Sequence, residues 1–153
     1  MKPNQKLIRK QLDSTLEKFK EASLVSIPRK GWVRAVRDAL GMTGPQLAKR
    51  MQVTKQRVQQ LEKDEIAGST TIKTMRQAAE ALNCVFVYSI VPQESLEKVV
   101  QKQARIIAEG RLRRISHTMS LEGQELDQPD IQDAMDNLVE ELIYTEQRSL
   151  WDL

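Results

Sequence analysis

"TGPQLAKRMQVTKQRVQQLE", residues 43–62, is the stretch that decides the fold we expect. It predicts two short helices joined by a tight turn. Thr43 and Thr54 stand where helix N-caps belong, because a side-chain oxygen there can accept a hydrogen bond from the first turn. Small Ala48 lets the two helices approach closely. The apolar residues expected to pack the second helix against the first are Val53, Val58 and Leu61.

Two further helices are expected to flank this pair. Residues 32–40 have the apolar spacing of a short helix, which Gly41 would end. After a loop over residues 64–69, Thr70 or Thr71 is expected to open a fourth helix. Its expected buried residues are Ile72, Met75, Ala78, Ala79 and Leu82.

Polar and basic residues occupy the expected outer face of the second helix. Gln can pair with adenine, and Lys with guanine, through two hydrogen bonds worth about 1–3 kcal/mol of discrimination. The residues expected to reach base edges are Lys55, Gln56, Gln59 and Gln60. Those expected near phosphates are Arg34, Lys49, Arg57 and Lys63, together with the helix starts at Thr43, Gly44 and Thr54, because helix N-termini hold anions. The alternative is a solvated helix face with no ligand.

Residues 31–82 resemble the phage-repressor (Cro/C1, or XRE-type) helix-turn-helix family, most closely in VTKQRVQQLE (53–62). The resemblance implies a mostly α-helical, lambda-repressor-like domain that binds double-stranded DNA with residues 55–63 in the major groove. Two positions depart from the family pattern. Gln52 stands at the turn, where the family often has Gly. Gly44 stands where the family often has a Gln that contacts phosphate.

Charge is divided unevenly along the chain, although the net charge is only +3. Residues 1–63 hold 15 Lys and Arg against 5 Asp and Glu, whereas residues 117–153 hold 1 against 10. The basic N-terminal part favours a polyanion as its partner, whereas the acidic C-terminal part favours a different function. The alternative is a set of solvated helix faces of opposite sign.

The segment CVFVYSIV, residues 84–91, predicts the one β-strand of the chain, because it is rich in β-branched and aromatic residues and stops at Pro92. A lone strand has no partner within the chain, so we expect antiparallel pairing with the same strand of a second copy. The residues expected to form this homodimer contact are Val85, Phe86, Val87, Tyr88 and Ile90. The alternative is an extended segment packed on its own helices.

Helices are also expected on either side of this central region. An amphipathic helix is predicted over residues 4–24, and Ser95 is expected to open another, with Gly110 as a candidate break. A break at residues 123–130 precedes a last helix over residues 130–144. We expect three regions: an N-terminal helix (1–28), the helix-turn-helix domain with its strand (29–92) and a helical region (93–153).

Thr118, Glu122 and Gly123 follow the order Ser/Thr–x–x–x–Glu–Gly/Asn. This order resembles the inhibitory motif of antitoxins that silence Fic-domain AMP-transferases. The resemblance implies that Glu122 pairs with an arginine of the toxin's ATP site and takes the room of the γ-phosphate. Thr118 and Glu122 would lie one helical turn apart on one face. The alternative is that these residues end a dimerisation helix, with Glu122 in solvent.

Together with the motif, GWVRAVRDALGMTGPQLAKRM (31–51) and STTIKTMRQAAEALNCVFVYSIVP (69–92) resemble the mobile mystery protein A family. Members are helix-turn-helix proteins encoded beside a Fic-domain protein. The resemblance implies an antitoxin that binds a Fic toxin and regulates its own operon. The alternatives are a stand-alone phage-type repressor and an adaptor whose acidic tail docks a basic partner.

Several functional classes are not expected. His117 is the one histidine and Cys84 the one cysteine, so we expect no enzyme, no metal site, no disulfide and no cofactor. No uninterrupted apolar run is long enough for a membrane span, so no membrane partner is expected. A charged N-terminus without an apolar run favours the cytoplasm.

Overall fold

The computed structural model describes residues 4–123 and 127–152 of the chain. Residues 1–3 of the predicted N-terminal helix region, residues 124–126 of the predicted break and residue 153 lie outside them. The chain divides into two compact units. One is Glu21–Ser89, and the other joins the N-terminal residues up to Lys20 with those from Ile90 onward. We call them the helix-turn-helix unit and the hairpin unit.

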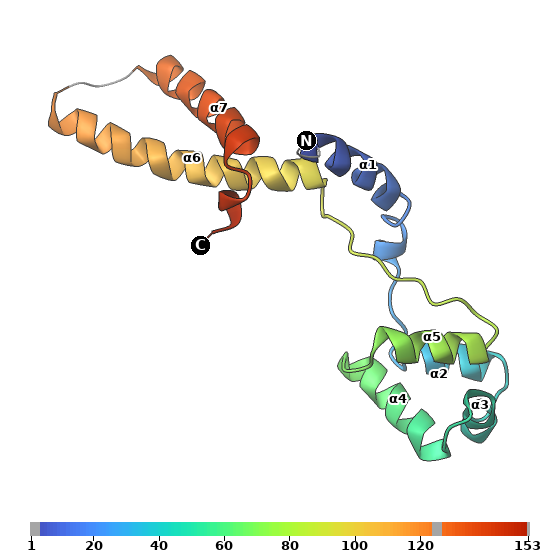
Figure 1. The fold of residues 1–153 in the computed structure, drawn as a ribbon. Coiled ribbons are helices and arrows are strands. Elements are labelled where there is room, and N and C mark those ends of the chain that lie inside the picture. Colours follow the sequence, from blue (N-terminus) through green and yellow to red (C-terminus); the bar gives the residue numbers. More distant parts are fainter. Residues whose placement is uncertain (1–3, 124–126, 153) are drawn as a thin grey trace. The chain divides into compact units, whose positions relative to one another are not determined.

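The helix-turn-helix unit holds the four predicted helices: α2 (Trp32–Ala39), α3 (Gly44–Met51), α4 (Lys55–Ala67) and α5 (Ile72–Ala81) (Figure 1). The starts of α3, α4 and α5 are fixed by threonine caps, as the sequence predicts. The side chains of Thr43, Thr54 and Thr71 each accept a hydrogen bond from the backbone N–H three residues later. A 3-10 turn, η1 (Ala22–Leu24), precedes them.

The predicted loop over residues 64–69 is wrong in its first part. α4 continues through Ala67 and ends at Gly68, whose left-handed φ of 73° terminates it. The residues that carry the helix on are Asp64, Glu65 and Ile66, which are compatible with a helix although they were expected in a loop.

One apolar core holds these four helices together. Its fully buried side chains include Leu47, Val58 and Leu61, each at most 1% exposed. Burying a side chain of this kind stabilises the fold by about 1.5–3 kcal/mol. The other buried members are Val33, Ala48, Met75, Ala78 and Leu82. Ile72, predicted in this core, is instead 46% exposed, because as the first residue of α5 it lies to the side of the face formed by the later residues.

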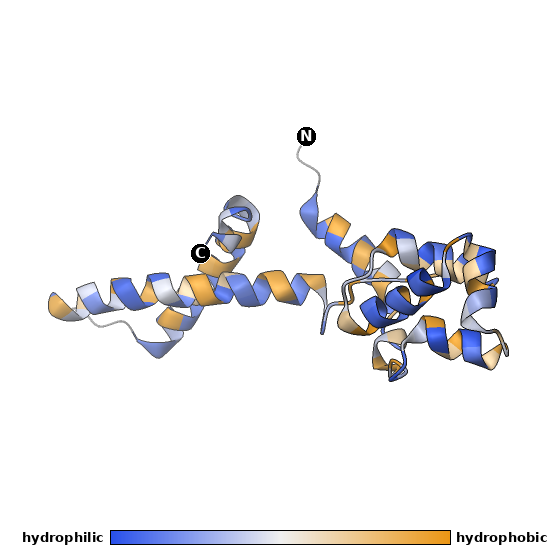
Figure 2. Ribbon diagram, turned by 90° about the horizontal axis from the view of Figure 1, so that it is seen from below, coloured by the Kyte–Doolittle hydropathy of each residue, from blue (hydrophilic) through white to orange (hydrophobic). Residues whose placement is uncertain are grey.

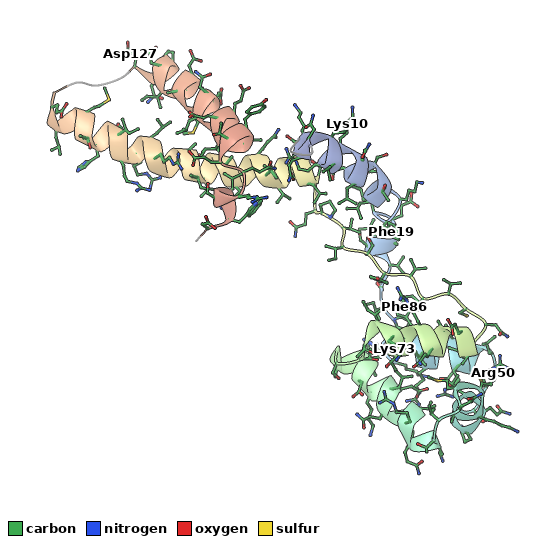
Figure 3. The ribbon with its side chains drawn as sticks, viewed as in Figure 1. Lys10, Phe19, Arg50, Lys73, Phe86 and Asp127 are labelled. Carbon is green, nitrogen blue, oxygen red and sulfur yellow. The ribbon has the colours of Figure 1, made fainter. Side chains whose placement is uncertain are left out.

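The predicted β-strand over residues 84–91 is not formed, and the described residues contain no strand. A strand needs a partner strand for its backbone hydrogen bonds, and the described residues offer none. Phe86 packs against the core and lies beside α5 in Figure 3. The Tyr88 ring lies 5.6 Å from the guanidinium carbon of Arg76 on α5. Four of the large side chains of this segment are exposed: Val85 (85%), Val87 (65%), Tyr88 (55%) and Ile90 (90%).

The hairpin unit consists of α1 (Gln5–Glu17), α6 (Leu96–Leu121), α7 (Gln128–Thr145) and the 3-10 turn η2 (Ser149–Trp151). α6 and α7 pack side by side (Figure 1). The helix predicted over residues 4–24 is shorter than expected, because α1 ends at Glu17. Gly110, the candidate break, lies inside an uninterrupted α6. A glycine there costs about 1 kcal/mol relative to alanine, which a helix of 26 residues tolerates.

A second apolar core joins α6, α7 and η2 of the hairpin unit. Its buried residues are Val100, Ala104, Ala108, Leu142 and Leu150. Figure 2 shows hydrophobic residues recurring along α6 between hydrophilic ones, the pattern of a helix with one buried face.

An ion pair also joins α6 to the C-terminal end of α7. Arg111 of α6 donates two hydrogen bonds to the Glu146 carboxylate (2.6 and 3.2 Å) and lowers the pKa of that carboxyl.

Polar contacts attach α1 to the start of α6. Nε of Arg9 lies 2.6 Å from a carboxylate oxygen of Glu97, and the Arg9 residue is only 8% exposed. The Asp13 carboxylate accepts a hydrogen bond of 2.8 Å from the backbone N–H of Leu96. α1 therefore supplies an acidic cap to α6, where the positive end of the helix dipole favours it.

None of the helices in the described part of the chain combines the length and the apolar character needed to cross a membrane.

Replacing Glu97 by Gln should destabilise the hairpin unit alone. The change keeps the shape but leaves a buried guanidinium without its carboxylate, which we expect to cost about 2 kcal/mol. Trp151 belongs to the hairpin unit and Trp32 to the helix-turn-helix unit, so urea unfolding of two single-tryptophan variants reports each unit separately. The matched control is Glu94→Gln, which breaks an exposed pair with Lys102 and should change little. Equal losses from both changes would contradict the prediction.

Candidate nucleic-acid interface

The turn between α3 and α4 sets the direction of α4. Gln52 caps α3 in the left-handed conformation, with φ 57°. The backbone N–H of Val53 donates to the carbonyl of Ala48 at 2.9 Å, which closes the turn. A left-handed conformation costs a side-chain-bearing residue about 1–2 kcal/mol, so the packing of the two helices must hold this turn in place.

Two carboxylates of α4 fasten that helix to α2. Arg37 of α2 donates to both oxygens of Glu62, at 2.7 and 3.3 Å, and both side chains are 12% exposed. The pKa of the Arg37 guanidinium is raised above its ordinary value because Glu62 accepts these hydrogen bonds. One turn further on, the Glu65 carboxylate accepts from the backbone N–H groups of Trp32 and Val33, at 2.6 and 3.1 Å, and so caps α2.

Gly31 makes the second of these contacts possible. Its φ is 80°, which favours glycine, and a Cβ there would lie 2.8 Å from Oε2 of Glu65. The inner face of α4 therefore contacts the rest of the unit through both apolar side chains and carboxylates.

The opposite face of α4 is polar and exposed. By helical periodicity the side turned furthest from Val58 and Leu61 holds Gln56, Gln59, Gln60 and Lys63, all exposed. Lys55 and Arg57 lie on the two flanks of this face. The amide of Gln60 is engaged, since its Nε2 donates to Asp64 at 2.7 Å. Among the described residues, the side chains of Gln56 and Gln59 form no such hydrogen bond, so they are the more accessible pair for base edges.

The start of α3 forms the other part of the predicted contact set. Thr43 Oγ1 accepts from the backbone N–H of Gln46, and the Gln46 side chain accepts from the backbone N–H of Thr43 at 2.8 Å. A threonine hydroxyl that accepts a cap bond still has its own proton to donate, for example to a phosphate. The same holds for Thr54 at the start of α4. A Cβ at Gly44 would meet nothing within 4 Å, so this backbone is open to a ligand. Lys49 of α3 is exposed as well.

The remaining predicted site residues lie in the hairpin unit. The Thr118 hydroxyl donates to the carbonyl of Arg114 at 3.0 Å. Glu122 is the C-cap residue of α6, and Gly123 follows with a left-handed φ of 76°. All three are exposed. The glycine at position 123 is therefore also explained by helix termination, because a residue in the left-handed conformation after a helix is usually glycine.

Sequence reasoning missed the residues that position the predicted face. These are Arg37, Gln46, Arg50, Glu62 and Glu65. Arg50, labelled in Figure 3, donates to the carbonyl of Ala81 and to Asn83 at the end of α5. The signal for two of them was present: Glu62 and Glu65 share a helical face with Val58 and Leu61, and a carboxylate on a buried face needs a partner.

Residues 33–86 match a protein family described as helix-turn-helix. The match covers about a third of the chain, from the first buried residue of α2 to Phe86 on the core. No curated protein and no solved structure matches the chain. The match confirms the helix-turn-helix part of the expected resemblance. It identifies a DNA-binding regulatory domain, and the chain is therefore a DNA-binding transcription regulator.

Two single changes should separate base reading from phosphate binding. Gln56→Ala should weaken binding to a duplex selected from a random pool by the wild type, by about 1–3 kcal/mol, and leave non-specific binding unchanged. Lys63→Ala should weaken both and lower the slope of log affinity against log salt by about 1. Fluorescence anisotropy at several salt concentrations measures both effects. Lys98→Ala, on α6, is the control that should change neither. If Gln56→Ala left base preference intact, α4 would not read bases as predicted.

Proposed function

We propose that this regulator binds operator DNA as a homodimer and is also the antitoxin of a Fic-domain toxin. In this proposal it represses its own operon from the cytoplasm and blocks AMP transfer by placing Glu122 in the toxin's ATP site. The observation that supports DNA binding is the exposed polar face of α4. This face is turned outward because the opposite side of the same helix is buried in the core. The antitoxin half rests on the resemblance to the mobile mystery protein A family and on the position of the motif.

The homodimer is supported by the segment that follows α5. Phe86 and Tyr88 attach this segment to the core and to Arg76, while the neighbouring Val85 and Val87 remain exposed. Its backbone has no ladder partner in the described chain. Antiparallel pairing with a second copy would give this backbone a partner and cover the exposed valines. Two α4 helices about one DNA turn apart would then read a palindrome.

The inhibitory role is supported by the local geometry of Glu122. Thr118 and Glu122 are one turn apart at an exposed helix end. Among described residues the Glu122 carboxylate forms no ion pair, and it stands at the negative end of the α6 dipole, an unfavourable place for an anion. An arginine fork from a partner would relieve this cost by donating two hydrogen bonds to the Glu122 carboxylate.

The antitoxin role is tested by co-expressing the chain with the Fic-domain protein encoded beside it and assaying the purified complexes for AMP transfer. Glu122→Gly should leave the complex intact and release AMP-transfer activity. The control is Ser120→Gly, which places a glycine equally near the end of α6 and should keep the toxin silent. If no complex forms, or if wild type and Glu122→Gly behave alike, the chain acts as a stand-alone repressor.

The homodimer is tested by Val87→Asp. A charge on this exposed face should prevent pairing, so sedimentation should show a monomer and operator affinity should fall by at least tenfold. The fall follows because one half-site then binds without the second. Ile106→Asp, a matched change at an exposed position of α6 (63% exposed), should leave the dimer intact. A Val87→Asp protein that remained dimeric would place the interface elsewhere.

A further inference from the structure

The third carboxylate of α4 takes no part in fastening that helix to α2. Glu62 and Glu65 are bound to Arg37 and to the start of α2. Asp64 instead accepts a hydrogen bond of 2.7 Å from Nε2 of Gln60, one helical turn earlier. Among the described residues the Asp64 carboxylate forms no ion pair. Its side chain therefore acts on the polar face of α4, and its charge is not neutralised there.

An uncompensated carboxylate at this place opposes DNA binding in general. Gln60 is exposed on the outer face of α4, and Asp64 lies beside it, partly exposed. The positions three and four residues from Asp64, where a helix brings side chains together, hold no Lys or Arg. Phosphates that approach this face therefore meet a negative charge, which lowers affinity for DNA of any sequence.

The same carboxylate fixes the direction of the Gln60 amide. A carboxylate accepts hydrogen bonds and cannot donate one, so it holds the nitrogen end of the amide and turns the oxygen end away. Nε2 carries two hydrogens, and Asp64 engages one of them. Gln60 is thus left with one acceptor, Oε1, and one remaining N–H donor for a base edge.

One acceptor and one donor match adenine better than the other bases. In the major groove adenine displays the N6 amino group as a donor and N7 as an acceptor, and glutamine can bind both at once. Guanine displays two acceptors, N7 and O6, and binding both would need the N–H group that Asp64 engages. Cytosine and thymine each offer one hydrogen-bonding group. The contact therefore favours adenine at the position that Gln60 reads.

We propose that Asp64 is a positioning residue that makes Gln60 specific for adenine. It acts through the Gln60 amide, and it lowers affinity for DNA in general while raising discrimination between bases. The inference rests on the predicted role of α4 as the base-reading helix. It is independent of the proposed homodimer and of the proposed antitoxin role.

A Gln–Asp pair four residues apart can also serve only to stabilise its helix. The chain holds a matched example outside the helix-turn-helix unit. Nε2 of Gln132 donates to Asp136 at 3.1 Å on α7. Asp136→Asn therefore removes the same charge and disturbs the same kind of contact, without touching α4.

The test measures the affinity of the full-length chain, at one salt concentration, for four duplexes that differ only at the base pair read by Gln60. That base pair is first located in a duplex selected by the wild type, as the position where Gln60→Ala loses its preference. The wild type should prefer adenine there. Asp64→Asn keeps the shape but lets the amide turn, because Asn both donates and accepts. It should lower the preference for adenine over guanine by about fivefold or more.

Asp64→Asn should at the same time raise affinity for unrelated duplexes, because it removes a charge that repels phosphates. Asp64→Glu keeps a carboxylate within reach of Gln60 and should retain both wild-type values. Asp136→Asn should change neither. Adding Asp64→Asn to Gln60→Ala should leave base preference as it is in Gln60→Ala alone, because Asp64 acts through Gln60.

Three results would overturn the inference. The first is a wild-type preference for guanine at this position. The second is an equal change in affinity for all four duplexes with Asp64→Asn, which would show an effect of charge or stability alone. The third is a Gln60→Ala protein with every base preference intact, which would remove Gln60 from the base-reading set while DNA binding by the chain stands. Thermal unfolding shows that each variant is folded.

Discussion

The close packing of α3 on α4 is the contact on which the rest of the helix-turn-helix unit depends. Leu47 and Ala48 belong to the same buried core as Val58 and Leu61, and together they fix which side of α4 turns inward. Once that side is buried, the glutamines and lysines of α4 lie on the side that faces solvent. The strained left-handed Gln52 is tolerated for the same reason, because the buried contacts on both sides outweigh the cost of its conformation.

Much of this unit could be predicted because its signals are local. A threonine cap acts on an N–H three residues away, and an apolar residue at every third or fourth position marks a face. These signals placed the starts of α3, α4 and α5, and they identified Val58 and Leu61 as core residues, whereas Val53, expected beside them, is 36% exposed. The outward residues of α4 followed from the same periodicity.

The features that could not be predicted depend on distant or missing partners. The strand expected at residues 84–91 needs a partner strand that the described residues do not provide. The extension of α4 to Ala67 accompanies the bond from Glu65 to the start of α2, a contact between residues more than 30 positions apart. The engagement of Gln60 by Asp64 is local, but it depends on that same extension, since residue 64 was expected in a loop. The sequence contains the residues that make such contacts, but it does not indicate which of them will contact one another.

The placement of one unit within the other in the sequence has a consequence for synthesis. The Arg9–Glu97 pair joins residues 88 positions apart, and the whole helix-turn-helix unit is encoded between them. At a translation rate of roughly 5–20 residues per second, α1 leaves the ribosome on the order of ten seconds before α6 does. The DNA-reading unit can complete its own core during that interval, while Ile8 and Leu12 of α1 are still without their final surroundings. The nascent chain is thus able to fold the half that binds nucleic acid before the other half has a hydrophobic core.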